Sequence, residues 1–311
     1  MTSWINSAIA NGHFQLYSYN EFHHIRYNGE GRFSRVASAD WPLTNRKVAL
    51  KKLKNFNIEK FVSEVQMHTT CHSNKNIVRF LGLTKEESEA SYIMIFEYAD
   101  RNNLRMFLQK NANLKWDIKL KLSLDISKGL LHLHSLNVAH RDLKSNDIVI
   151  NQDHYGYIAK ITDFSRAKML SDDRNDNDTD RVIGPIPFTD PKCLNDPKHY
   201  RKDLRSDIYS LGVILWEISS GRVPFESFMP DSRGEFRDLC LTFEIIGGLR
   251  ERHVPHTPEG YVKLYKRCYD NEPDERPDIE TVIEVLKTIS SRLSRSLEQA
   301  MVTANNIVIT K

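Results

Sequence analysis

The sequence has little net charge, few cysteines and no long apolar run. Its 311 residues carry a net charge of +3, which indicates no general attraction to nucleic acid or to membranes. No apolar run is long enough to cross a bilayer, and the first residues lack a secretory pattern. The four cysteines lie far apart without metal-site spacing, so reduced thiols are expected. We therefore expect a cytoplasmic protein (a nuclear one being the other option) without a membrane span and without a nucleic-acid partner.

The first third of the chain has the patterns of β-strands. Residues 1–21 are short and mixed, with one possible helical turn, and we interpret them as an N-terminal extension. Residues 22–99 combine short apolar runs, turn-forming residues and one amphipathic stretch. The elements expected there are β structure over 25–52 with a hairpin turn at 40–45, a helix over 58–70, and strands over 77–83 and 92–98. This pattern predicts a small β-rich lobe with one main helix.

After about residue 100 the pattern changes to helices. Apolar residues over 118–133 follow one face of a long helix, and 279–289 predicts another. The stretch 206–219 begins with a capping-type serine and is apolar nearly all round, yet it is too short for a membrane span, so a buried central helix is expected. We expect a larger helical lobe over 100–290 and a C-terminal tail over 291–311.

Two glycines and a lysine in the β-rich part are candidates for phosphate binding. Gly29 and Gly31 lie between two predicted strands, where the absence of side chains lets backbone N–H groups approach a phosphate. A plain hairpin turn explains the same glycines. Lys51 lies on a predicted strand among apolar neighbours, and Glu64 on the next helix offers it a partner. An outward-facing surface lysine is the other interpretation.

The densest group of polar residues is the run His140-Arg141-Asp142-Leu143-Lys144-Ser145-Asn146-Asp147. Asp142 follows an apolar approach and a turn, as expected for a carboxylate at the rim of a cleft. Asp163 closes a short predicted strand, where it could hold Mg²⁺, an ion that prefers one or two carboxylates plus substrate phosphates. Each acid taken singly is more typical of a solvated turn, but their order and spacing together favour a phosphoryl-transfer site.

Taken together, these residues resemble the eukaryotic protein kinase family over about residues 22–290. The segments Cys268-Tyr269 and Trp216-Glu217-Ile218 look most like its tyrosine-kinase-like branch of serine/threonine kinases. The resemblance implies a two-lobed α+β protein kinase fold with an N-lobe over 22–99 and a C-lobe over 100–290. It also implies ATP with Mg²⁺ or Mn²⁺ as cofactors, and protein substrates.

The family pattern assigns roles to four of these side chains. Lys51 would contact the α- and β-phosphates and pair with Glu64. Asp142 would be the catalytic base that orients the substrate hydroxyl and accepts its proton, and Lys144 would neutralise the transferred γ-phosphate.

The same pattern places the metal ion and the adenine ring. Asp163 and Asp147 would be the metal ligands, and Glu97-Tyr98-Ala99 would be the hinge that binds adenine through backbone groups. Six residues would line the adenine pocket, namely Val36, Ala49, Phe96, Glu97, Ala99 and Val149. An ordinary apolar core explains Val36, Ala49 and Val149 equally well.

The chain departs from the family pattern at several positions. Asp147 replaces an asparagine, and Ser34 and Ser165 replace glycines. An extra acid near Asp142 and Asp163 raises the pKa of one carboxyl group unless a cation lies between them. The serines restrict the backbone of their turns. Catalytic competence therefore depends on how the site accommodates Asp147.

Two further departures concern the support of the site. Lys192 stands where the family has a glutamate that pairs with the residue equivalent to Arg276, so a substitute acid is expected, either Asp190 or Glu217. His68 stands four residues after Glu64, where an apolar residue is usual, and indicates a less firmly assembled active state. The family pattern also implies that Asp207 hydrogen-bonds the backbone of the loop around Asp142, a structural role.

Substrate preference and regulation are only partly indicated. Lys144 is typical of kinases acting on serine and threonine, whereas Pro185 is typical of tyrosine-directed enzymes. Ser171 and Thr179, in an acidic stretch, are candidate phosphorylation sites whose phosphates could dock on Arg141. A solvated acidic loop is the simpler interpretation. We expect a protein serine/threonine kinase in signalling, with a pseudokinase as the alternative and a small-molecule phosphotransferase as a third; the oligomeric state stays open.

Overall fold

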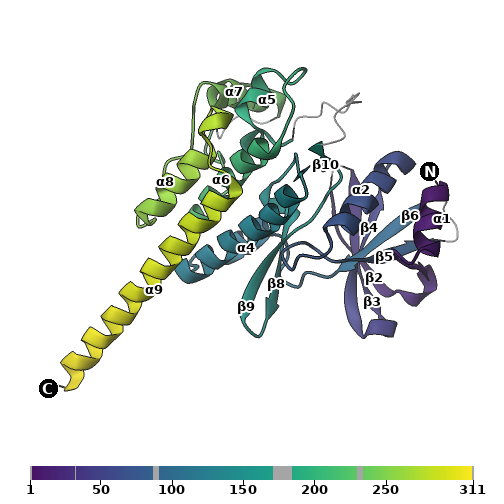
Figure 1. The fold of residues 1–311 in the computed structure, drawn as a ribbon, viewed down its shortest axis with the longest axis horizontal. Helices are drawn as coiled ribbons and strands as arrows, with labels where there is room; N and C mark the ends of the chain where they lie inside the picture. Colours follow the sequence, from purple (N-terminus) through teal and green to yellow (C-terminus); the bar gives the residue numbers. More distant parts are fainter. Residues whose placement is uncertain (1, 32, 87–90, 171–183, 230–233, 310–311) are drawn as a thin grey trace.

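The chain folds into a β-sheet lobe that carries the N-terminus and a helical lobe that carries the C-terminus (Figure 1). This computed structural model describes residues 2–31, 33–86, 91–170, 184–229 and 234–309. A single core cluster fills most of the helical lobe, and two smaller clusters lie on either side of the sheet. This arrangement confirms the expected two-lobed α+β fold.

The sheet of the smaller lobe brings the expected nucleotide-binding residues onto neighbouring strands. Its order is β1-β5-β6-β4-β3-β2, antiparallel except for the pair β1 and β5. The strands are β1 (Leu16–Ser18), β2 (His23–Glu30), β3 (Ser34–Trp41), β4 (Arg46–Leu53), β5 (Phe80–Lys85) and β6 (Tyr92–Glu97). Val36 lies opposite Lys51, and Ala49 lies opposite Phe96. Because alternate residues of a strand share a face, these four side chains lie on one side of the sheet.

The N-terminal residues interpreted as an extension belong to the packing of this lobe. α1 (Thr2–Ala10) precedes β1, which adds a parallel strand beside β5. Ile5 and Phe14 are buried in the same cluster as Phe61 of α2 (Ile58–Cys71). Figure 1 shows α1 at the outer end of the lobe, beside the sheet. α1 and Phe14 therefore pack in the same core cluster as α2.

α2 turns two ionisable side chains toward the protein interior. The side chain of Asn57 caps its start by accepting hydrogen bonds from two backbone N–H groups of the first turn. Phe61 and Val65 bury the apolar face against the sheet. Glu64 and His68, one turn apart, are also buried, with 1% of each residue exposed. The helix therefore brings a carboxylate and an imidazole to the boundary between the lobes.

The helical lobe is built around α4 and α6. Its helices are α3 (Leu104–Lys110), α4 (Trp116–Ser135), α5 (Pro191–Asn195), α6 (Leu204–Ser220), α7 (Glu235–Ile246), α8 (Glu259–Cys268) and α9 (Ile279–Ile309). Short strands accompany them, namely β7 (Val138–Ala139), β8 (Ile148–Asp153), β9 (Gly156–Ile161) and β10 (Lys168–Met169). α6 is buried along nearly its whole length, as its composition predicts. Its N-cap is Asp203 rather than the expected Ser206.

The C-terminal residues extend the last helix. α9 packs on α4 and continues to Ile309, so most of the expected tail of 291–311 is helical. Figure 1 shows this end of α9 projecting away from the rest of the molecule. In the described part of the chain, no helix combines the length and the apolar character needed to cross a bilayer.

Candidate active site

Lys51 of β4 joins two carboxylates that come from different lobes. Its Nζ atom lies 2.5 Å from Oε1 of Glu64 on α2 and 2.7 Å from Oδ1 of Asp163, which follows β9. The lysine side chain is 9% exposed. Burial opposes its charge, but the carboxylates of Asp163 and Glu64 raise the pKa of Lys51. The ammonium group is therefore held charged between the sheet, the helix and the C-lobe.

The loop between β7 and β8 is anchored by a buried acid of α6. The backbone N–H groups of His140 and Arg141 donate hydrogen bonds of 2.8 and 2.9 Å to the carboxylate of Asp207. Arg141 has a φ of 67°, a left-handed conformation that is costly for a residue with a side chain. Asp207 is 1% exposed. Its two hydrogen bonds hold the strained backbone that presents the next residue, Asp142.

Within this loop Lys144 lies between two acids. Its Nζ atom is 3.0 Å from Oδ2 of Asp142 and 2.5 Å from Oδ2 of Asp147. Burial, together with the charges of Asp163 and Asp142, raises the pKa of Asp147 well above its ordinary value despite the opposing effect of Lys144. The cation that the extra acid requires is thus supplied, in this structure, by Lys144 itself.

The turn after β9 accommodates Ser165 without strain at that position. The residue with a left-handed backbone is Asp163, with a φ of 65°, whereas Ser165 has no positive φ. The serine side chain hydrogen-bonds Asp163. Burial opposes ionisation of Asp163, but Lys51, Lys144 and this hydrogen bond lower its pKa. The expected restriction at position 165 is therefore absent from the turn seen here.

The residues expected around adenine lie along the boundary between the lobes. Val36, Ala49 and Val149 are partly exposed, whereas Phe96 is 5% exposed. Ala49 and Val149 pack against the same cluster that contains Phe96. Three partly exposed apolar side chains from both lobes provide surfaces that a flat aromatic ring could cover. They also belong to the margin of the core, so both interpretations of these residues hold.

Glu97 of the expected hinge is bound to the C-lobe, whereas Gly29 and Gly31 border open space. Glu97 directs its side chain to Lys160, with 2.6 Å between Oε1 and Nζ, and Ala99 follows in a partly buried segment. At Gly29 an added Cβ would meet no atom within 4 Å, and at Gly31 the nearest would be 3.6 Å away. The space beside these two glycines is therefore open.

The carboxylates of Asp163 and Asp147 are suitable ligands for a divalent cation that nucleotide phosphates also bind. In the described ranges no three His, Cys, Asp or Glu side chains are grouped as a complete metal site. Asp163 is exposed over 32% of its side chain and Asp147 over 8%. Two carboxylates are what Mg²⁺ takes from a protein when phosphates and water supply its other oxygens. Asp147 would have to release Lys144 to take part.

Asp190 is the acid that pairs with Arg276 in place of the glutamate of the family pattern. Its carboxylate contacts Nη1 of Arg276 at 2.6 Å and Nη2 at 3.1 Å, and both side chains are 0% exposed. Lys192 pairs instead with Glu272 at 2.6 Å on the surface. Of the two acids expected as substitutes, Asp190 is thus the partner, and the other, Glu217, is bound to an arginine of α3.

His68, expected to weaken the active state, is buried among aromatic rings that include Phe164. The candidate phosphorylation sites Ser171 and Thr179 lie outside the described residues.

Sequence reasoning missed two residues close to Asp142. An added Cβ at Gly184 would lie 2.2 Å from Oδ1 of Asp142, so a side chain there would displace this carboxylate. Arg166 places its Nε atom 3.9 Å from Oδ2 of the same carboxylate. The one signal available for Arg166 was a cation directly after Asp163-Phe164-Ser165, and its position depends on the fold.

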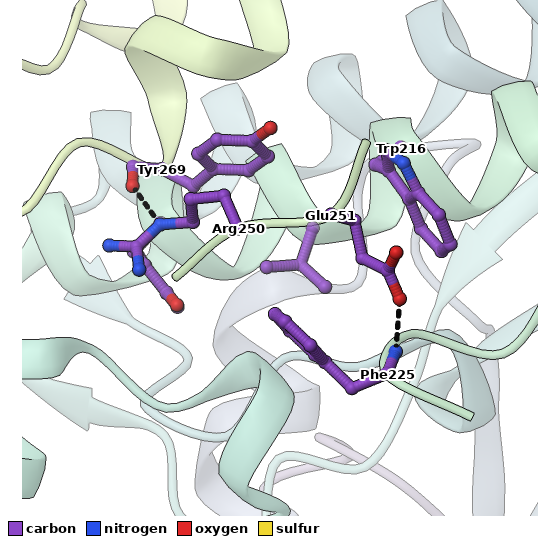
Figure 2. A pocket seen from close by; sticks show the side chains of 7 residues that line it. Trp216, Phe225, Arg250, Glu251 and Tyr269 are labelled. Atoms are coloured by element: carbon purple, nitrogen blue, oxygen red, sulfur yellow. Dashed lines mark hydrogen bonds between the residues drawn. The ribbon is translucent and has the colours of Figure 1, made fainter. Parts of the chain in front are cut away.

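A separate small pocket lies in the helical lobe, away from these residues. Figure 2 shows it between α6 and the segments that carry Phe225, Arg250 and Tyr269. Arg250 donates to the carbonyl oxygen of Tyr269 at 2.9 Å, and Glu251 accepts from the N–H group of Phe225 at 2.5 Å. None of the expected site residues lines this pocket.

Comparison with known proteins agrees with this geometry. Residues 23–286 match the family model of protein tyrosine and serine/threonine kinases. The chain therefore belongs to the eukaryotic protein kinase family, with similarity to its tyrosine-kinase-like branch. It is 29% identical over 287 residues to dual specificity testis-specific protein kinase 2 of Rattus norvegicus, covering 92% of this chain and 48% of the relative.

Two further relatives come from other organisms. The serine/threonine/tyrosine-protein kinase HT1 of Arabidopsis thaliana is 30% identical over 232 residues, covering 74% of this chain and 54% of the relative. A probable LIM domain-containing serine/threonine-protein kinase of Dictyostelium discoideum is 30% identical over 257 residues, covering 80% and 36%. The chain thus spans about half the length, or less, of these curated relatives.

Proposed function

We propose that this chain transfers the γ-phosphate of ATP to serine and threonine hydroxyl groups of proteins, with Mg²⁺ or Mn²⁺ as the metal ion, in a signalling pathway. The observation that carries the proposal is the position of Lys51, whose ammonium group contacts both Glu64 and Asp163. In protein kinases this lysine must pair with the glutamate of the helix while the aspartate is in place for the metal. This contact is therefore the feature that best supports the binding of ATP.

The nucleotide would lie between the lobes. Val36, Ala49 and Val149 would contact the two faces of adenine, and the backbone of 97–99 would hydrogen-bond its edge. Gly29 and Gly31 would let backbone N–H groups approach the phosphates. When bound between Asp163, Asp147 and the phosphates, the metal ion would supply positive charge for the developing negative charge.

Asp142 would act on the substrate hydroxyl group. Its carboxylate orients the hydroxyl and accepts the proton as the oxygen attacks the γ-phosphorus, while ADP leaves. The hydrogen bonds between Asp207 and the loop backbone keep this carboxylate in position. In this class of enzyme, positioning and electrostatic stabilisation supply most of the catalytic effect. Lys144 is the feature that favours serine and threonine, as in the family pattern.

The preference for serine and threonine is the finer part of the proposal. One relative is named a dual specificity kinase and another a serine/threonine/tyrosine-protein kinase. Pro185, which is typical of tyrosine-directed enzymes, also favours action on tyrosine. Assays should therefore include tyrosine-containing substrates beside serine and threonine ones.

A pseudokinase is the second candidate, and one contact favours it. Lys144 lies 2.5 Å from Asp147 and so competes with a metal ion for the second metal-ligand position. If that ion pair persists when nucleotide binds, the chain would hold nucleotide or partners without transferring phosphate.

One experiment separates the two candidates. The purified chain is incubated with ATP and Mg²⁺ or Mn²⁺, and mass spectrometry detects autophosphorylation and transfer to a generic protein substrate. Asp142→Asn is the inactive control, expected to lose about 10²–10⁴-fold in rate. Wild-type product no greater than that of Asp142→Asn with either metal would overturn the kinase proposal. Binding of ATP in that case would support the pseudokinase.

A further inference from the structure

Lys144 is occupied by the two acids of its own loop. Its Nζ atom contacts Asp147 at 2.5 Å and Asp142 at 3.0 Å, and its side chain is 17% exposed. The stronger pairing is with Asp147, the residue that replaces an asparagine. While this contact lasts, the charge of Lys144 is shared between two carboxylates, and little of it is left for a transferred phosphoryl group.

Arg166 brings a second cation to the carboxylate of Asp142. Its Nε atom lies 3.9 Å from Oδ2 of Asp142, and its side chain is 18% exposed. Its guanidinium carbon lies 5.3 Å from the ring centroid of Phe33, in the turn between β2 and β3 that also contains Gly31. Arg166 therefore lies between the catalytic carboxylate and the glycine-rich turn, where a γ-phosphate would pass.

The balance of charge makes this cation significant. Four carboxylates meet here, those of Glu64, Asp142, Asp147 and Asp163, but Lys51 and Lys144 are the only lysines paired with them in the described contacts. The triphosphate of a nucleotide adds more negative charge. A guanidinium group is always charged and matches the oxygens of a phosphate with its fork of N–H donors.

We propose that Arg166 is a catalytic residue that contacts the γ-phosphate of the bound nucleotide and takes over the part of this task that Lys144 cannot perform while bound to Asp147. The inference rests on the proposed kinase function. In the step itself the substrate oxygen bonds to the γ-phosphorus, the bond from phosphorus to the β,γ-bridging oxygen breaks, and the proton passes to Asp142. Arg166 forms no covalent bond and stabilises negative charge on the phosphoryl oxygens.

Nucleotide binding tests the contact without requiring turnover. Calorimetry compares ADP with a non-hydrolysable ATP analogue, both with Mg²⁺, on wild type, Arg166→Gln and Arg166→Lys. Arg166→Gln should weaken binding of the triphosphate about 10-fold while changing ADP binding less than about twofold, and Arg166→Lys should lie between. Lys263→Gln, which removes an exposed charge of α8, is the matched control and should change neither affinity.

Asp147→Asn tests whether Arg166 replaces Lys144. This variant frees Lys144, so adding Arg166→Gln to it should weaken triphosphate binding by less than about threefold, against about 10-fold in the wild-type background. Equal losses for ADP and the triphosphate would show a purely structural role and would overturn the proposal, as would no loss for either. An identical effect of Arg166→Gln in both backgrounds would refute the replacement of Lys144.

The kinase assay stays separate from this comparison. A wild-type chain that binds both nucleotides but transfers no phosphate would contradict the proposed function, yet a selective loss of triphosphate binding in Arg166→Gln would still support the γ-phosphate contact. If the wild-type chain transfers phosphate, Arg166→Gln should lower kcat by at least about 10²-fold.

Discussion

The imidazole ring of His68 stacks on the phenyl ring of Phe164, with 4.5 Å between the ring centroids and 29° between the planes. The ring centroid of Phe80 lies 6.2 Å from that of His68, and the ring centroid of Phe14 lies 5.6 Å from that of Phe80. A row of rings thus connects the N-terminal segment, through α2, to the residue that follows Asp163. A titratable group therefore lies within the stack that contacts Phe164, the neighbour of Asp163 in the candidate site.

His68 should make the stability of the protein fall at mildly acidic pH. Neither of its ring nitrogens has a hydrogen-bond partner among the described residues. Burial, followed by the charge of Lys51, lowers its pKa well below 6.5, with His140 acting in the same direction and Asp163 against it. The histidine is therefore neutral when folded but is protonated in the unfolded chain below about pH 6.5, which lowers the free energy of unfolding as the pH falls.

We expect His68→Leu to remove this dependence. Between pH 7.5 and 5.5 the wild-type chain should lose about 1.4 kcal/mol more of its free energy of unfolding than the variant does. Urea denaturation at the two pH values measures the difference. His154→Leu, on the exposed turn between β8 and β9, should retain the wild-type dependence. An equal pH dependence in wild type and His68→Leu would show that His68 takes up a proton without cost.

The N-terminal helix should stabilise α2 and, through it, nucleotide binding. Ile5 is 0% exposed and belongs to the same cluster as Phe61 of α2. Ile5→Ala should lower the free energy of unfolding by about 2–5 kcal/mol, the usual cost of a cavity in a core. Because α2 carries Glu64, the affinity for an ATP analogue should fall severalfold as well. Thermal denaturation and calorimetry measure the two effects.

Leu43→Ala is the control for this experiment, since Leu43 is 71% exposed in the turn between β3 and β4. It should change the free energy of unfolding by no more than about 0.5 kcal/mol. A stable Ile5→Ala variant would mean that α1 rests on the lobe without supporting it.

The elements that the sequence predicted are those with a local cause. The hairpin of β3 and β4, the helix α2 and the buried helix α6 each follow from a periodic pattern or from turn residues within the element. β1 was missed because three residues of strand form there only through the free edge of β5, more than 60 positions away. The helical end of α9 was missed because its composition is uninformative.

The candidate site shows the same division. Spacing along the chain was enough to single out Lys51, Glu64 and Asp163. The sequence left open whether Asp190 or Glu217 pairs with Arg276. The answer depends on which acid the fold places beside the guanidinium group. No sequence pattern relates Arg166 to Asp142, which are 24 positions apart and meet only in the folded chain.

The pair formed by Asp190 and Arg276 should be essential for stability. Both side chains are 0% exposed, and Asp190→Ala would leave a buried guanidinium group without its carboxylate. Such a loss costs about 3–5 kcal/mol. Lys192→Ala, which removes an exposed partner of Glu272, should cost less than about 1 kcal/mol. Chemical denaturation of the two variants, side by side, measures the contrast, and similar losses would argue against the substitution of partners.

Asp147→Asn should stabilise the chain at neutral pH in metal-free buffer. The pKa of Asp147 is raised in the folded state, chiefly by burial and then by the charges of Asp163 and Asp142. An acid whose pKa is raised by folding contributes its full stability only below its unfolded pKa of 3.8, and loses that contribution as the pH rises through the folded pKa. At neutral pH the carboxyl group of Asp147 therefore lowers the free energy of unfolding.

Denaturation of the wild type and of Asp147→Asn at pH 4 and pH 7.5, with a chelator present, tests this expectation. The variant should be the more stable protein at pH 7.5, and the difference should shrink toward pH 4. Asp117→Asn, an exposed acid in the first turn of α4, should show no such convergence. A variant less stable than the wild type at pH 7.5 would mean that the ion pair with Lys144 outweighs burial. In that case Asp147 would stabilise the loop through its ion pair with Lys144. The ammonium group of Lys144 would then provide the positive charge that the second metal ion provides in other protein kinases.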